Sequence, residues 1–262
     1  MTKQEKIGKT NLMNCGMEAT IINIKDNGKI DIKFKDGTII TDKYFYDFIH
    51  GRIKNPNCKT VCGVGCIGQG KYKTTQNGKQ TQAGVAWYEM MKRCYGNQKE
   101  IKHPTYKDCT VCEEWHNFQN FAKWYYNNRW DNKLVLIPDK DILTHNYGIS
   151  KIYSPDTCLL VDNRINNLFT KCDKSRGDLP IGVKKSYNKY GITLSIFDKT
   201  KNNHKKWINL GNFDTPNEAF EVYKKEKEKY IKQIAEEYKE NYDSFPQELY
   251  EAMRDYKVQI DD

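Results

Sequence analysis

The sequence predicts a chain of the α+β class, in which small β-sheets and α-helices form separate layers. Apolar and charged residues alternate from Ile30 to Lys35, which is the period of a half-buried strand. Two apolar runs, 134–137 and 158–161, enclose a polar loop, an arrangement typical of a hairpin. Thr215 and Glu218 form a capping box in front of a segment with helical spacing of apolar residues. Strands and helices are therefore both expected, divided among several small domains.

The first domain, 1–54, is expected to be a small β-barrel. Its sequence predicts strands at 18–24, 29–34 and 38–41. The dipeptides Asn27-Gly28 and Asp36-Gly37 favour the positive φ values of tight hairpins. Short strands joined by tight turns are typical of an SH3-like or related barrel. Because such barrels bind peptides, nucleic acids or neighbouring domains, this segment predicts no particular function.

Residues 55–83 are expected to form a basic connector, because they are rich in Gly, Asn, Lys and Cys and show little periodicity. No Asp or Glu occurs between Phe48 and Tyr88. The basic residues of that interval are Arg52, Lys54, Lys59, Lys71, Lys73 and Lys79. A stretch of this kind either contacts the phosphates of a nucleic acid or is a solvated linker.

A central domain is expected at 84–176, and its first half is predicted to be helical. Helices are expected from about Gly84 to Cys94 and from about Cys112 to Asn127. Apolar side chains recur in the second helix at spacings of three and four, and core packing is the expected role of this stripe, formed by Trp115, Phe118, Ala122 and Tyr125.

The second half of this domain predicts a hairpin followed by a helix. The run 134–137 is expected to be a strand that ends at Asp139, Lys140 and Asp141. The run 158–161 is the second strand, and it leads into an Asn-rich helix that begins near Asn163. Two strands and a short helix with these polar residues are the outline of a small nuclease site that holds one metal ion.

Five stretches of the chain resemble phage-type HNH endonuclease-like proteins, which pair an HNH core with a C-terminal AP2-like DNA-binding domain. These stretches are WYEMMKRCY at 87–95, CTVCEEWHNFQNFAKW at 109–124, DKDIL at 139–143, YSPDTC at 153–158 and INNLF at 165–169. The resemblance runs from about residue 49 to residue 242. It implies a central ββα-metal core of the HNH type with flanking helices, in which an Asp and a helical Asn or His hold a divalent cation while a His activates water.

The resemblance places Asp139 and Asn166 at the metal-binding positions, with Mg²⁺ or another divalent cation as cofactor. Asn167 is the less favoured alternative to Asn166. Lys140 stands where the family has its His. An ordinary Lys, with a pKa of about 10.4, is protonated at neutral pH, whereas His, with a pKa of about 6.5, is not. Lys140 therefore cannot replace the His as a base.

Three interpretations of this departure remain open. His145 or Asp141 supplies the base, the metal alone generates hydroxide from bound water, or the site is inactive. Lys140 would then contact the scissile phosphate as a point charge.

The cysteines suggest a possible structural zinc site. Cys109 and Cys112 have the two-residue spacing of zinc ligands, and Cys94 and Cys158 are the candidates for the other two. The alternative is that these residues are buried apolar thiols. Nine cysteines, an odd number, favour thiols or metal ligands over a disulfide framework.

A DNA-binding domain is expected at 177–243. Strands are predicted at 190–197 and 205–210, and the capping box at Thr215 begins a helix that ends near Glu240. The segment resembles an AP2-like domain, whose three-stranded sheet is backed by one helix and enters the major groove. Carried over by position, the candidates for DNA contact are Lys184, Lys185, Tyr190, Thr193, Ser195, Lys205, Lys206 and Trp207. Strand alternation turns about half of any such list toward the helix.

The distribution of charge favours double-stranded DNA as the partner. Lys and Arg number 43 against 34 Asp and Glu, a net charge of +9. From Lys171 to Leu210 ten basic residues stand against three acidic ones, which is what phosphate contact requires. Residues 244–262 are expected to form a C-terminal helix and an acidic tail.

The sequence predicts an intracellular, cytoplasmic protein. No apolar stretch approaches the ~20 residues that span a bilayer, and the N-terminus lacks the apolar core of a signal peptide. The predicted function is that of an HNH-family DNA endonuclease that hydrolyses phosphodiester bonds with a divalent metal. The alternative is a catalytically inactive HNH-derived protein that binds DNA, or a phage factor that binds and inhibits a host defence protein.

Overall fold

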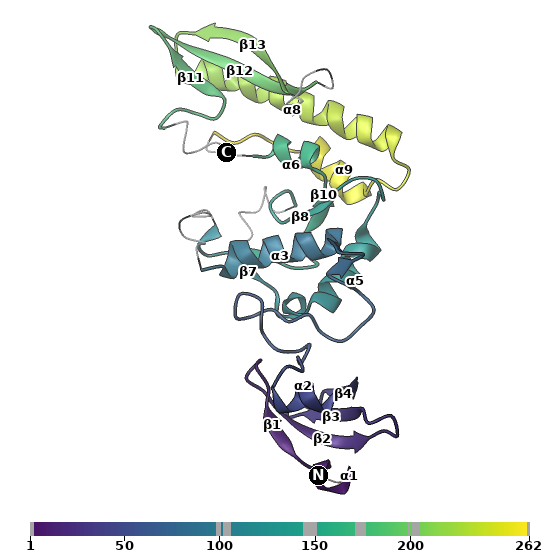
Figure 1. Ribbon diagram of the computed structural model, residues 1–262. Coiled ribbons are helices and arrows are strands. Elements are labelled where there is room, and N and C mark those ends of the chain that lie inside the picture. The colour runs from purple at the N-terminus through teal and green to yellow at the C-terminus, as the bar shows by residue number, and fades with distance from the viewer. Residues whose placement is uncertain are drawn as a thin grey trace. The chain divides into compact units, whose positions relative to one another are not determined.

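The computed structural model describes residues 3–97, 101, 106–143, 151–170, 177–198, 200 and 205–260 (Figure 1). Helices and strands are mixed along these residues, which confirms the α+β class. The chain divides into two compact units, Met1–Tyr126 and Asn127–Asp262. The division falls inside 84–176, so this predicted central domain contributes to both units. No helix among the described residues is long and apolar enough to cross a membrane.

The N-terminal part of unit 1 is an antiparallel sheet with the strand order β1-β2-β3-β4. Its elements are α1 (Lys3–Lys6), β1 (Thr10–Leu12), β2 (Glu18–Ile24), β3 (Ile30–Phe34), β4 (Ile39–Lys43) and α2 (Phe45–Ile49). Ile30, Ile32 and Phe34 of β3 are buried, as their alternation predicts. They share a core with Ile21 of β2 and with Phe48 of α2. The helix α2 thus covers the apolar face of the sheet.

This sheet does not close into the predicted SH3-like barrel. β1 and β4 lie at its two edges, and they are not paired with each other in the part of the chain that the structure describes. β1 contributes three residues, and β4 pairs with β3 across a register shift between Ile30 and Ile32. Barrels contain about eight strands, or five in small partly open forms. Four short strands are too few for the edges to meet, and α2 completes the core instead.

The second half of unit 1 is a layer of helices that packs through aromatic side chains. Its elements are β5 (Thr75–Gln76), β6 (Lys79–Gln80), α3 (Gln82–Tyr95), β7 (Thr110–Val111), the 3-10 helix η2 (Glu113–His116) and α5 (Phe118–Asn128). The predicted core stripe is confirmed, because its four members, Trp115, Phe118, Ala122 and Tyr125, are at most 1% exposed. Trp87 of α3 joins them, and its Nε1 donates a hydrogen bond to the backbone oxygen of Trp115 at 2.7 Å.

One side chain of α5 makes three hydrogen bonds to the predicted connector. Gln119 Nε2 donates to the backbone oxygens of Ile67 and Tyr72, at 3.1 and 3.0 Å. Gln119 Oε1 accepts the N–H of Tyr72 at 3.1 Å. Farther along, β5 and β6 form a hairpin whose turn residues, Asn77 and Gly78, have positive φ. The connector is therefore a packed part of unit 1 and not a free linker.

Unit 2 contains a short hairpin, a three-stranded sheet and a long helix. Its elements are β8 (Ile137–Asp139), β9 (Ile152–Tyr153), β10 (Leu159–Val161), α6 (Asn163–Leu168), β11 (Val183–Ser186), β12 (Lys189–Phe197), β13 (Lys205–Phe213), α8 (Pro216–Asn241) and α9 (Gln247–Arg254). The sheet is antiparallel with the order β11-β12-β13, and α8 packs along it (Figure 1). The predicted capping box is present, since Glu218 N–H donates to Thr215 Oγ1 and Glu218 Oε2 accepts the N–H of Thr215.

Polar contacts join α6 to α8, and those of Asp162 are buried. The N-cap residue Asp162 accepts the N–H of Ile165 at 2.9 Å and the hydroxyl of Tyr238 at 2.7 Å. Arg164 makes a bidentate pair with Glu237, with both contacts at 2.6 Å. Burial and the bond to Asp162 raise the pKa of Tyr238, so its hydroxyl remains a donor. These contacts fix the position of a short helix that would be unstable by itself.

Replacing Tyr238 with Phe is expected to lower the free energy of unfolding by about 2 kcal/mol, because the buried Asp162 carboxylate loses a donor. The matched control is Tyr242→Phe, which alters the neighbouring ring of the same aromatic cluster. The Tyr242 side chain is only partly buried, so this change is expected to cost less than about 0.5 kcal/mol. Urea unfolding measures both values. Equal losses in the two variants would show that the Tyr238–Asp162 bond does not stabilise unit 2.

Candidate functional site

The hairpin of unit 2 and the helix after it have the predicted ββα order. β8 and β10 pair antiparallel, with Asp139 opposite Leu159 and Ile137 opposite Val161. α6 begins two residues after β10. β8 begins at Ile137 and not at Leu134, because Asp131 Oδ1 accepts the N–H groups of Lys133 and Leu134, both at 2.7 Å, and holds the start of the predicted run in a turn.

Asp139 is the last residue of β8, and half of its carboxylate is engaged by the backbone. Oδ1 accepts the N–H groups of Asp141 and Ile142, both at 2.9 Å. Within the described part of the chain, Oδ2 makes no hydrogen bond. Burial and the charge of Asp141 raise the pKa of Asp139. The second oxygen is therefore available for a further partner, and a cation there would stabilise the charged form.

Lys140 lies inside unit 2 and not at its surface. Its side chain is 4% exposed, and Nζ forms an ion pair with Asp141 Oδ1 at 2.5 Å. Nζ also lies 5.8 Å from the centroid of the Tyr153 ring. An ammonium that donates to a carboxylate has no lone pair and cannot accept a proton. Its burial also argues against the expected contact with a scissile phosphate.

Of the remaining predicted catalytic residues, the structure describes Asn166 but not His145. His145, the first candidate for the base, lies outside the described residues. Asn166 lies in α6, about 200° around the helix from Arg164. Asn167, in contrast, faces the same side as Arg164, where both line a cavity. The helix therefore distinguishes the two asparagines, and Asn166 is the one directed away from the cavity.

The predicted zinc ligands are buried or half-buried thiols. Cys94 and Cys109 are buried and Cys112 is intermediate, all in unit 1, whereas Cys158 is buried in unit 2. Burial of Cys158 raises its pKa to about 12, which disfavours the thiolate that zinc requires. Within the described ranges, no group of three or more His, Cys, Asp or Glu residues is placed so that it could hold a metal ion. The zinc site therefore stays a prediction.

A pair of thiols that sequence spacing does not reveal lies in unit 1. Cys58 Sγ lies 3.6 Å from the backbone oxygen of Cys15, as a hydrogen-bond donor. Burial by itself raises the pKa of Cys15, but the hydrogen bonds from Cys58 and from the N–H groups of Asn55 and Met17 outweigh it and lower the pKa. Burial and the bond to Cys15 raise the pKa of Cys58 to about 12. No local motif could have predicted this pair, because the two residues are far apart in the chain.

The C-terminal sheet has one face toward α8 and one open face. Ile192 and Leu194 of β12 are at most 5% exposed and face α8. Strand alternation turns Thr193 and Ser195 to the open face. In β13, Trp207 pairs with Ser195, and Lys205 pairs with Phe197. Lys184 of β11, opposite Gly191, joins them. Five of the predicted DNA-contact residues therefore share one face: Lys184, Thr193, Ser195, Lys205 and Trp207.

The other three predicted contacts lie on the helix side of the sheet. Tyr190 has the parity of Ile192 along β12, and Lys185 pairs with Tyr190. Lys206 pairs with Ile196, which has the same parity. These three side chains therefore do not share the open face, and their contact with DNA stays a prediction. The sequence could not distinguish these three residues from the other five, because it does not fix the register of the strands.

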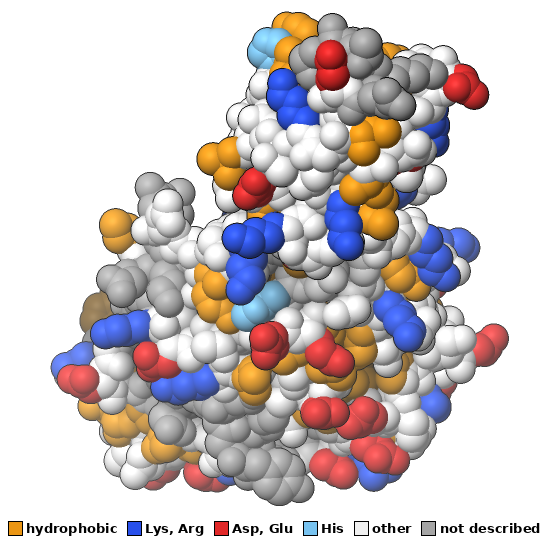
Figure 2. All heavy atoms as spheres, turned by 90° about the horizontal axis from the view of Figure 1, so that it is seen from below, with side chains coloured by type: hydrophobic (Ala, Val, Ile, Leu, Met, Phe, Trp, Pro, Cys, Tyr) orange, Lys and Arg blue, Asp and Glu red, His pale blue; other side chains and the backbone are white. Residues whose placement is uncertain are grey.

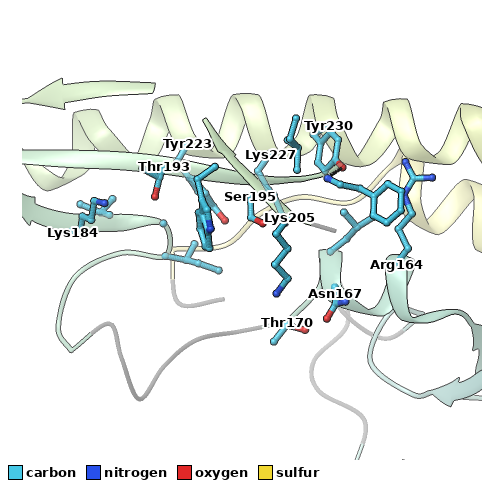
Figure 3. Close-up of a pocket in the computed structure, with 17 residues that line it drawn as sticks. Arg164, Asn167, Thr170, Lys184, Thr193, Ser195, Lys205, Tyr223, Lys227 and Tyr230 are labelled. Atoms are coloured by element: carbon cyan, nitrogen blue, oxygen red, sulfur yellow. Dashed lines mark hydrogen bonds between the residues drawn. The ribbon is translucent and has the colours of Figure 1, made fainter. Parts of the chain in front are cut away.

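The open face ends in a cavity that the sequence did not predict. Lysines and aromatic side chains from α8 line it together with the sheet, among them Tyr223, Lys227 and Tyr230 (Figure 3). The sequence does not show which strands these helix residues contact, because that depends on tertiary packing. The described cavity lining carries Lys without Asp or Glu, and in this respect it differs from the face that Figure 2 shows, where Lys and Arg side chains are spread among uncharged and acidic ones.

Comparisons of the chain with protein-family models, with curated proteins and with solved structures find no match. The function is therefore inferred from the geometry of unit 2 and from its charges.

Cys15 is expected to react with iodoacetamide faster than Cys58, because a lowered pKa gives more thiolate at a given pH. The rate at Cys15 should rise at a pH below the ordinary thiol value of 9.0, whereas Cys58, with a pKa of about 12, should still react slowly at pH 9. Mass spectrometry of peptides after timed labelling measures both rates. Cys158, also at about 12, is the slow reference in unit 2. Equal labelling of all three thiols would contradict the assignment.

Proposed function

We propose that this chain is a DNA endonuclease of the HNH-like type, in which the ββα segment cuts and the C-terminal sheet binds DNA as an AP2-like domain does. The observation that carries the proposal is the order of β8, β10 and α6, with Asp139 as the last residue of the first strand. The resemblance of the sequence to HNH endonuclease-like proteins predicts this order. The open face of β11-β13, which carries two lysines, supports DNA as the substrate.

A divalent cation would be held by Asp139, with Asn166 of α6 as the second ligand. The donor set fits a hard cation, because both side chains offer oxygen. Asp141 lies beside Asp139 and raises its pKa, and a divalent charge would relieve this repulsion. Such a cation polarises a phosphodiester and lowers the pKa of bound water. In this proposal Asp139 and Asn166 bind and orient, while the base is His145 or Asp141.

One observation favours a second candidate, a protein that binds DNA without cutting it. Lys140 occupies the position of the family's His, and it is buried and paired with Asp141. Asp141 is then a partner of the lysine and is less suited to accept a proton from water. A protein of this kind could act by occupying a site on DNA, or it could bind a host protein.

Cleavage of supercoiled plasmid with Mg²⁺, Mn²⁺ or EDTA tests the first proposal. Asp139→Ala is expected to lower the cleavage rate at least about 100-fold, because a ligand of the cation is lost. Asp156→Ala, an exposed carboxylate in a turn, is the control and should leave the rate unchanged. Cutting only by Lys140→His would support the second candidate. Unchanged cutting by Asp139→Ala would overturn the assignment of the site.

Two adjacent lysines test the DNA-binding face. Lys205→Ala is expected to weaken binding to duplex DNA and to reduce the slope of log K against log salt by about 0.9, because one phosphate contact is lost. Lys206→Ala removes the same charge from the helix side of the same strand and is expected to have a smaller effect. Fluorescence anisotropy at several salt concentrations measures both. Equal effects of the two substitutions would show that the open face is not the binding face.

A further inference from the structure

A cavity of about 400 Å³ opens where the edge of the C-terminal sheet meets α6 and α8 (Figure 3). β11 pairs with β12 only as far as Ile192, so the stretch Thr193–Phe197 of β12 is not covered by β11. The cavity lies beside this stretch. Its residues all belong to unit 2. The volume is within the range of sites that bind small ligands.

The charge of the cavity wall is positive. Lys184, Lys205 and Lys227 line it from β11, β13 and α8, and no Asp or Glu is among the described lining residues. Figure 3 shows the Lys205 side chain extending toward Asn167 and Thr170 at the end of α6. Arg164 is the fourth cation of the lining, and it is paired with Glu237. Basic side chains from four elements, with no acidic one among the described lining residues, favour an anionic ligand.

The same wall carries flat aromatic rings. Trp207 is 64% exposed at the cavity, and it is the one Trp among the exposed large apolar residues of the described chain. Deeper in, the Tyr223 ring packs so closely on Gly182 that an added Cβ there would lie 2.3 Å from it. An exposed indole beside lysines is suited to stack on a base, because every base has a flat π-face.

The cavity is less suited to a peptide that adds a strand to β12. Strand addition requires the free N–H and C=O groups of the sheet edge. The N–H of Phe197 already donates to the hydroxyl of Tyr230 at 2.7 Å. Tyr230 thus occupies one donor of the exposed stretch, and the wall next to it offers charge and rings instead of a backbone ladder.

We propose that this cavity binds a nucleoside phosphate, with the base against Trp207 and the phosphate among Lys184, Lys205 and Lys227. The nucleotide is either a free one or one unstacked from a DNA strand that lies on the open face. The second source rests on the proposed function, whereas the first does not. Neither requires cleavage.

Isothermal titration calorimetry of the full chain tests the proposal with dAMP, a short single strand of DNA and inorganic phosphate. We expect dAMP or the single strand to bind and phosphate to bind much more weakly, since it lacks the base. Lys227→Ala should weaken binding about tenfold, the loss of one charge-assisted contact. Trp207→Ala should do the same, and Trp207→Phe should restore most of the affinity. Lys225→Ala, an exposed lysine of α8 outside the cavity, should change it less than about twofold.

Each outcome decides the proposal. Binding of dAMP identifies a free nucleotide as sufficient, and binding of the single strand alone identifies a nucleotide within DNA. Absence of binding by both ligands overturns the proposal, and so do equal affinities for phosphate and dAMP. Unchanged binding by Lys227→Ala and Trp207→Ala, with thermal unfolding like that of the parent, overturns it as well. If an acidic peptide displaces dAMP completely, and if the affinity for dAMP does not depend on Trp207, the cavity belongs to a protein partner and the proposal is overturned.

The test is separate from that of DNA binding by the sheet. Lys227 belongs to α8 and is not part of the open face. Loss of duplex binding in Lys205→Ala, with dAMP binding unchanged in both Lys227→Ala and Trp207→Ala, would support the DNA function and overturn the cavity proposal. Nucleotide binding without any duplex binding by the parent chain would remove only the proposed DNA function.

Discussion

The hydrogen bond from Tyr238 to Asp162 is the contact on which the arrangement of unit 2 depends. Asp162 also caps α6, so one buried carboxylate fixes both the start of this helix and its distance from α8. A helix of six residues has little stability without tertiary contacts. Trp130 reinforces the joint, since its Nε1 donates to the backbone oxygen of Leu160 at 2.8 Å and its ring packs against Tyr238.

Because α6 is fixed in this way, one short helix holds residues of both proposed sites. Asn166 faces away from the cavity and is the proposed ligand of a cation at Asp139. Arg164 and Asn167 face the cavity beside the sheet. A shift of α6 would therefore change both sites together. The bidentate Arg164–Glu237 pair opposes such a shift, because two parallel contacts restrain rotation as well as distance.

The end of β8 illustrates how one ion pair limits the chemistry of a site. Lys140 is held inside by Asp141, and Asp139 is held in place by two backbone N–H groups. Burying the Lys140 charge is costly, and the pair with the exposed Asp141 carboxylate offsets part of this cost. Asp139 Oδ2 is the atom that this arrangement leaves for a ligand. The open sheet face is different, since its lysines have water on one side and suit reversible contact with phosphates.

Local sequence patterns determined the elements of this protein, and tertiary contacts decided how they are used. The alternation in β3, the aromatic stripe of α5 and the capping box of α8 were predictable, because each depends on neighbouring residues along the chain. The barrel was not, since closure depends on strand number and length across the whole sheet. Burial of Lys140, the register that separates Lys205 from Lys206, and the cavity at Trp207 also required the structure. Each of these depends on residues far apart in sequence, and a local pattern does not determine which distant surface it will contact.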